Sequence, residues 1–137
     1  MNIYFCGSIK GGRQHAEWYG ELIAHMKKFG NVLTEHVGDV NYAGGKSPQD
    51  VYIQDTDWLR QSDIVVADVT VTSMGVGYEL AFAEALGKPC LVLFDNKFAD
   101  KISYMISGNG YFKCFGYDTH QQAIDIFEKF LHENEGR

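Results

Sequence analysis

Short apolar runs alternate along the chain with segments in which apolar residues recur at helical spacing. The runs are rich in β-branched and aromatic residues, and they predict strands at 2–6, 31–34, 63–69, 88–94 and 111–115. The periodic segments predict helices at 13–29, 48–60, 76–86 and 119–134, and a short helical piece at 98–106. Neither a repeat nor a linker interrupts this alternation, so we expect one domain over residues 1–137.

The order of these elements predicts an α/β fold. Ser47 and Pro48 are typical of the first positions of a helix, with Asp50 closing a capping box, and Gly87 is typical of a helix end. Strands joined through helices pair in parallel, because the connection must return to the same edge of the sheet. We therefore expect a doubly wound, five-stranded parallel sheet in the flavodoxin-like order 2-1-3-4-5.

Two glycine-rich loops border the crevice where such sheets bind ligands, outside the carboxyl ends of strands 1 and 3. Their sequences are GSIKGGR at 7–13 and TVTSMGVG at 70–77, and each precedes a predicted helix. Backbone amides at a helix start favour an anion, and Lys10 and Arg13 add positive charge. Glycine-rich loops are also ordinary turns, but two of them at one crevice favour a phosphate-sized anion site. The dinucleotide and P-loop motifs are both absent from the sequence.

Charge and composition narrow the range of partners. With 12 basic and 18 acidic residues the net charge is −6, which argues against binding to a nucleic acid polymer. No apolar run has the length of a membrane span. The cysteines are odd in number and lie in apolar runs, which is typical of buried thiols in a cytoplasmic protein: Cys6, Cys90 and Cys114. The histidines show no metal-binding spacing, so we expect neither a metal nor a cofactor.

Two carboxylates lie at unusual positions. Asp55 belongs to the stripe of helix 48–60 that is expected to be buried, together with Val51, Trp58 and Leu59. A buried aspartate is either paired structurally or used in chemistry. Glu79 is expected in the first turn of the helix that follows the second glycine-rich loop, where the helix dipole favours the ionised form. Acidic residues at this position also serve stability alone.

Tyr4 lies in the middle of the first predicted strand, where its hydroxyl needs a buried partner. The strand order places Tyr4 near the loop after strand 3, so Glu79 is the candidate partner. Two carboxylates beside an anion site suit cleavage of a glycosidic bond. His36 either borders this site or lies at the surface, and the loop 37–46 is either a lid or a surface connection.

The segments YFCGSIKGGR at 4–13, VLTEHV at 32–37 and SMGVGYEL at 73–80 resemble the 2'-deoxynucleoside 5'-monophosphate N-hydrolases of the nucleoside 2-deoxyribosyltransferase superfamily. The resemblance implies that Glu79 is a nucleophile that forms a covalent deoxyribosyl intermediate. It also implies that Asp55 assists acid–base chemistry and holds a sugar hydroxyl, and that Tyr4 orients the nucleophile. Lys10 stands where this family usually has arginine, and lysine lacks the planar fork of the guanidinium group.

The same resemblance implies a homodimer and a set of substrate and phosphate contacts, with Ser103 reaching the site of the neighbouring subunit: Gly7, Ser8, Ile9, Lys10, Gly11, Gly12, Ser73, Gly75 and Ser103. The expected reaction is hydrolysis of a deoxynucleoside monophosphate to a free nucleobase and 2-deoxyribose 5-phosphate. Deoxyribosyl transfer between nucleosides and hydrolysis of a ribonucleotide are alternatives on the same fold. A nucleotide-binding sensor without catalysis is the alternative outside the enzymes.

Overall fold

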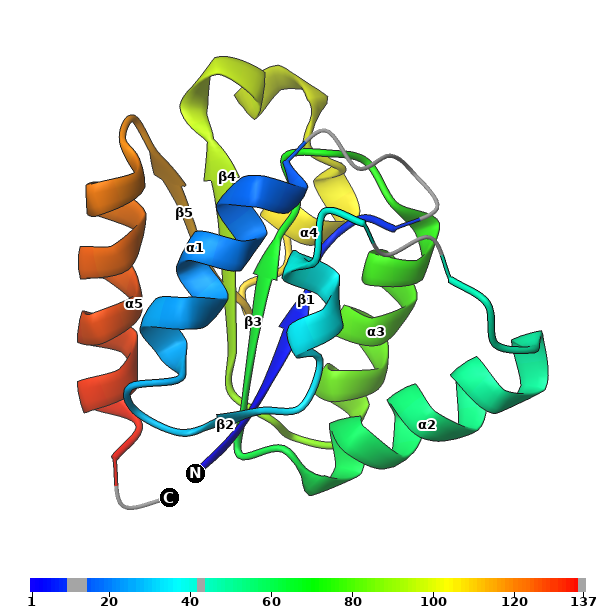
Figure 1. Ribbon diagram of the computed structural model, residues 1–137. Helices are drawn as coiled ribbons and strands as arrows, with labels where there is room; N and C mark the ends of the chain where they lie inside the picture. Colours follow the sequence, from blue (N-terminus) through cyan, green and yellow to red (C-terminus); the bar gives the residue numbers. More distant parts are fainter. Residues whose placement is uncertain (10–14, 42–43, 136–137) are drawn as a thin grey trace.

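The computed structural model describes residues 1–9, 15–41 and 44–135. Strands and helices alternate along the described chain (Figure 1). The strands are β1 Asn2–Cys6, β2 Asn31–Val32, β3 Ile64–Asp68, β4 Cys90–Asp95 and β5 Lys113–Tyr117. The α-helices are α1 Ala16–Met26, α2 Pro48–Gln61, α3 Met74–Ala85, α4 Tyr104–Ser107 and α5 His120–Glu133, and the 3₁₀ helices are η1 Glu35–Gly38 and η2 Asn96–Lys101.

The sheet has five parallel strands in the order β2-β1-β3-β4-β5, which confirms the predicted topology. Figure 1 shows α1 and α5 on one side of the sheet and α2 and α3 on the other. The chain leaves β1 toward one edge of the sheet and leaves β3 toward the other edge. The carboxyl ends of β1 and β3 therefore form the switch point at which α/β sheets bind ligands.

Successive residues of β1 face opposite sides of the sheet, because side chains alternate along a strand. Ile3 and Phe5 pack in the core beneath α1 and α5. Tyr4 and Cys6 pack in the second core, which Leu59 of α2 and the buried face of α3 complete. The alternation therefore directs the Tyr4 side chain to the side of the sheet that α2 and α3 cover.

Strand β2 is shorter than the predicted 31–34, and η1 follows it. The reason is a side chain that takes over part of the strand pairing. The Thr34 hydroxyl accepts a hydrogen bond from the Phe5 amide at 2.8 Å and donates one to the Phe5 carbonyl at 2.7 Å. Because these backbone groups of β1 already have partners, the chain is free to turn into η1 after Val32.

Side-chain caps define where α2 and α3 begin. The Ser47 hydroxyl accepts from the Asp50 amide at 3.1 Å, as predicted. The Ser73 hydroxyl accepts from the Val76 amide at 3.3 Å, so α3 begins at Met74 and not at the predicted residue 76. Gly87, with φ of 73°, ends this helix as predicted.

The predicted buried stripe of α2 is correct only near its carboxyl end. Leu59 is fully buried and Trp58 packs against the same core. Val51, however, is 36% exposed, and Tyr52 and Ile53 are exposed beside it, because only the second half of α2 packs on the core. None of the described helices combines the length and apolar character needed to cross a bilayer.

Candidate active site

Asp55 of α2 and Glu79 of α3 line one pocket of about 380 Å³. Gly75 belongs to the same pocket, and apolar side chains of α2 form part of its wall. Both carboxylates are half-buried. The structure therefore brings together two of the three residues for which the sequence predicts chemistry. The third, Tyr4, contacts Glu79.

The Tyr4 hydroxyl donates a hydrogen bond to Oε2 of Glu79. Tyr4 has no exposed surface, and Glu79 is the partner that the strand order predicts. Burial, followed by the negative charge of Glu79, raises the pKa of the Tyr4 hydroxyl far above its usual range. Tyr4 therefore stays protonated and can only donate to the carboxylate, which holds Glu79 in one orientation.

Glu79 lies in the second turn of α3, because Ser73 starts the helix earlier than predicted. The prediction that the dipole of the first turn keeps Glu79 ionised is therefore wrong. Burial raises the pKa of Glu79 to about 7, the Tyr4 hydrogen bond opposes this shift, and the charge of Asp55 adds to it. A carboxylate with this pKa exchanges its proton near neutral pH.

Asp55 has a different set of neighbours. Burial raises its pKa, while the Gln54 amide, His36 and Lys46 act in the opposite direction. The Gln54 amide donates to Oδ1 of Asp55 at 3.3 Å, and the Lys46 ammonium donates to the Gln54 amide oxygen. Two basic side chains therefore lie close enough to Asp55 to favour its charged form, and neither acts in this way on Glu79.

His36 and Lys46 are the neighbours of Asp55 that sequence reasoning did not place. His36 lies in η1, its ring centroid is 5.9 Å from that of Trp58, and its charge lowers the pKa of Asp55, although His36 does not line the pocket. Lys46 lines the pocket itself. Lys46 directly precedes Ser47, the cap of α2. The sequence predicts this cap, and from it one could have inferred that Lys46 lies beside the first turn of α2.

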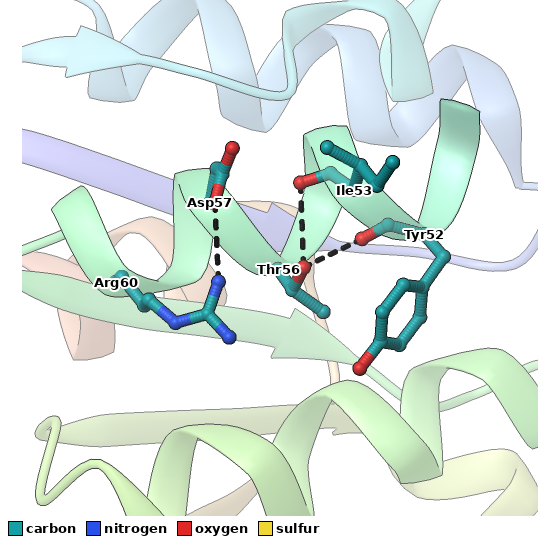
Figure 2. A network of polar contacts seen from close by, with 5 residues as sticks. All are labelled: Tyr52, Ile53, Thr56, Asp57 and Arg60. Carbon is teal, nitrogen blue, oxygen red and sulfur yellow. Dashed lines mark hydrogen bonds and ion pairs between the residues drawn. The ribbon is translucent and has the colours of Figure 1, made fainter. Parts of the chain in front are cut away.

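Figure 2 shows the polar contacts that Thr56 and Asp57 make within α2. Thr56 lines the pocket, but its hydroxyl donates to the carbonyl oxygens of Tyr52 at 2.7 Å and Ile53 at 3.3 Å. On another face of the helix Asp57 pairs with Arg60 at 3.1 Å in solvent. The Thr56 hydroxyl thus has its hydrogen-bond partners within the helix. Asp55 is the acidic side chain of α2 that lines the pocket.

The loop after β1 begins in a tightly packed environment. A Cβ atom at Gly7 would lie 2.8 Å from the Tyr19 ring, so only glycine fits there. Ser8 is fully buried, and its amide donates to the Tyr19 hydroxyl at 3.4 Å. Ile9 packs against the core on the α1 side of the sheet. Three further predicted contacts lie outside the described residues: Lys10, Gly11 and Gly12.

Ser73 and Ser103 line a second cavity, of about 500 Å³, on the other flank of α3. Lys101 lines this cavity as well. The Ser103 side chain is exposed and accepts from the Met105 amide at 3.2 Å. Within one chain, therefore, these two serines do not share a pocket with Asp55 and Glu79, whereas Gly75 does.

Metal chemistry has no obvious donor set in the described part of the chain. Within residues 1–9, 15–41 and 44–135, the His, Cys, Asp and Glu side chains form no group of three or more that could hold a metal ion. The pocket itself presents two carboxylates, one hydrogen-bonded to the Tyr4 hydroxyl and the other to the Gln54 amide.

Comparison with known proteins gives one consistent family. The sequence model of the nucleoside 2-deoxyribosyltransferase family matches residues 3–129. The chain is 46% identical over 114 residues to a 5-hydroxymethyl-dUMP N-hydrolase of Rattus norvegicus, an alignment that covers 78% of this chain and 69% of that protein. It is 39% identical over 137 residues to the protein of the same name from Danio rerio, covering 97% and 94% of the two chains.

Among solved structures, a CMP N-glycosidase of Clostridium botulinum has a TM-score of 0.70 at 19% identity. The superposition covers 94% of this chain and 99% of the other, so the two proteins share a fold. The family match spans both carboxylates, Tyr4 and every predicted phosphate contact. This chain therefore belongs to the nucleoside 2-deoxyribosyltransferase family.

Proposed function

We propose that this protein hydrolyses the N-glycosidic bond of 2'-deoxynucleoside 5'-monophosphates and releases a nucleobase and 2-deoxyribose 5-phosphate. The observation that carries the proposal is the pairing of Glu79, held by Tyr4, with Asp55 in one pocket. The two relatives described above, whose names give them as N-hydrolases of a deoxynucleoside monophosphate, support the same reaction.

In the proposed mechanism Glu79 is the nucleophile. Its ionised carboxylate attacks the anomeric carbon of the sugar, a carbon–oxygen bond forms, and the bond to the base nitrogen breaks. The electron pair of that bond leaves with the base. Tyr4 donates to one oxygen of Glu79, which leaves the other oxygen to face the sugar. Water then attacks the same carbon and releases the sugar phosphate.

Asp55 is the proposed acid–base residue. It delivers a proton to the departing base and later accepts one from the attacking water, and a sugar hydroxyl lies within its reach in the proposed complex. The Gln54 amide occupies Oδ1 of Asp55, so the other oxygen, Oδ2, is the one that carries the proton. Burial raises the pKa of both carboxyl groups, and the division of roles proposed here therefore rests on their contacts, with Tyr4 on Glu79 and Gln54 on Asp55.

The phosphate is proposed to bind where the loops after β1 and β3 meet. Gly7 and Ser8 end the first strand, and Ser73 caps α3, whose first turn presents free backbone amides. Gly75 lies within that turn and brings the backbone to the catalytic pocket without a side chain between them. Four further contacts complete the proposed set: Ile9, Lys10, Gly11 and Gly12.

The reaction is tested by incubating the purified protein with dAMP, dGMP, dCMP, dTMP and 5-hydroxymethyl-dUMP and resolving the released base by chromatography. We expect base from at least one of them, and much less from the matching nucleosides and ribonucleotides. Release of no base from any of the five would contradict the proposal. If a second base added to the reaction were converted into a new deoxynucleotide, or into a new nucleoside when the donor is a nucleoside, transfer would be the activity.

We also propose that the active form is a homodimer in which Ser103 completes the phosphate site of the neighbouring subunit. Met74, Tyr104 and Met105 are 92%, 89% and 81% exposed, which is unusual for large apolar side chains. Val51, Tyr52 and Tyr78 extend this exposed apolar surface over α2 and α3. Ser103 lies directly before Tyr104 and is exposed as well, which supports a contact between Ser103 and a second copy.

A mixed dimer tests this arrangement. Glu79→Gln and Ser103→Asp chains, co-expressed with different tags, form hybrids in which one site is intact and the other carries both changes. If Ser103 acts across the interface, each hybrid should have about half the wild-type kcat, since one of its two symmetric sites works. Hybrids as inactive as the parents, or a species of one 15.4 kDa chain in sedimentation, would contradict the proposal.

A further inference from the structure

Asp68 is a fully buried carboxylate at the carboxyl end of β3, outside the pocket that holds Asp55 and Glu79. Three donors surround it. Its Oδ2 accepts from the Trp18 indole at 2.9 Å and from the Tyr117 hydroxyl at 2.7 Å, and its Oδ1 accepts from the Thr70 amide at 2.9 Å. The carboxylate is thus satisfied by groups of three separate elements: α1, β5 and the loop after β3.

The loop after β3 is tied down at its start by these contacts. The Thr70 amide donates to Asp68, and the Thr70 hydroxyl accepts from the Asp95 amide at 2.9 Å. Ser73, the proposed phosphate contact and cap of α3, follows three residues later. Asp68 therefore sets where this loop leaves the sheet.

Two consecutive residues in the first two turns of α1 hold the two loops. Trp18 donates to Asp68 and so contacts the end of β3. Tyr19, the next residue, receives the Ser8 amide at 3.4 Å, and its ring lies against Gly7. Trp18 and Tyr19 are adjacent on α1, so the same part of this helix contacts both the end of β3 and Gly7 and Ser8 after β1.

We propose that Asp68 is a positioning residue, which acts through Trp18 and Tyr19 to fix the position of Gly7 and Ser8 relative to the start of the loop after β3. The inference rests on the proposed function, since these loops are the proposed phosphate site. A phosphate bound from two sides needs donors at hydrogen-bond distance on both sides at once, and an ångström of misplacement weakens such a site. Asp68 does not line the pocket of Asp55 and Glu79, and its hydrogen bonds go to Trp18, Thr70 and Tyr117.

Trp18→Phe is the informative variant, because it removes the indole donor and keeps an aromatic ring on α1. We expect KM for the deoxynucleotide to rise about tenfold while kcat stays within about twofold, since the catalytic pocket is unaltered and the phosphate site is loosened. The kcat/KM for the matching deoxynucleoside, which has no phosphate, should stay within about twofold. A purely structural defect would lower the activity toward both substrates alike.

Tyr117→Phe is the matched control. It removes a donor from the same oxygen of Asp68, but Tyr117 lies on β5, so both links through α1 remain. Thermal unfolding should show that the two variants lose similar stability, and KM of Tyr117→Phe should change by less than about twofold. Equal rises in KM for both variants, or an unchanged KM in Trp18→Phe, would overturn the proposal.

The affinity for 2-deoxyribose 5-phosphate, measured by titration calorimetry, tests the positioning role without turnover. This affinity should fall about tenfold in Trp18→Phe and stay nearly unchanged in Tyr117→Phe. A wild-type protein that binds the sugar phosphate but releases no base would contradict the proposed reaction. The positioning role would then still be tested by the affinities of the two variants, because this measurement needs no catalysis. Equal affinity of Trp18→Phe and wild type would contradict the positioning role.

Discussion

Glu79→Gln should lower kcat by at least about a thousandfold, because an amide cannot form the covalent bond to the sugar. The neutral side chain still accepts from Tyr4, so folding and nucleotide binding should persist. Base release measured by chromatography, together with nucleotide affinity measured by calorimetry, separates these effects. Glu21→Gln on the exposed face of α1, where Glu21 pairs with His120, should retain full activity.

The same variant has an expected signature in stability. Burial raises the pKa of Glu79 to about 7 in the folded protein, compared with about 4.3 in an unfolded chain. A raised folded pKa means that the contribution of Glu79 to stability is fully present below about pH 4 and is lost as the pH rises through 7. Glu79→Gln should therefore unfold several degrees higher than wild type at pH 8 and at a similar temperature at pH 4.

Two outcomes would contradict this assignment for Glu79. Unchanged kcat would move the nucleophile to another residue. A difference in unfolding temperature that is the same at pH 4 and pH 8 would show that Glu79 does not titrate above its unfolded pKa. Differential scanning fluorimetry at the two pH values measures the second directly.

Asp55→Asn should lower kcat by about a hundredfold to a thousandfold, as expected when a positioned general acid is lost. This loss of kcat should nearly disappear with a substrate that carries 4-nitrophenol on the anomeric carbon of 2-deoxyribose 5-phosphate, because 4-nitrophenolate leaves without a proton. Asp57→Asn is the matched control, since Asp57 lies two residues along α2 and is paired with Arg60 in solvent (Figure 2). It should keep wild-type kcat with both substrates.

An equal loss of rate with both leaving groups would assign Asp55 to holding the sugar and not to proton transfer. An unchanged kcat with natural deoxynucleotides would remove Asp55 from the mechanism altogether. The comparison is sharp because the two aspartates share one helix and differ in burial, so the substitution itself is the same in each variant.

Periodicity predicted the alternation of strands and helices correctly, because a buried strand such as IVVAD at 64–68 differs clearly from the helical segments around it. Element boundaries were less accurate where one side chain decides them. The Thr34 hydroxyl ends β2 early and the Ser73 hydroxyl starts α3 early. Such hydrogen bonds between a side chain and the backbone leave no trace in a hydrophobic pattern.

The pair of Tyr4 and Glu79 was predictable, since strand alternation and strand order together place them on one side of the sheet. The surroundings of Asp55 were not, because His36 and Lys46 lie in segments without periodicity. Asp68 was overlooked for a related reason. An aspartate that ends an apolar strand signals a buried charge, but its donors come from helix and strand positions distant in sequence.

The anchor of Glu79 is a residue of a central strand, whereas the proposed phosphate contacts come from the ends of strands and the segments beyond them. The proposed nucleophile is thus held in place by a residue of the central sheet. Mutations that reshape the rim can alter which nucleotide is admitted and still leave the bond-breaking group where it was. Such an arrangement allows related proteins to diversify in substrate preference while inheriting a common chemistry.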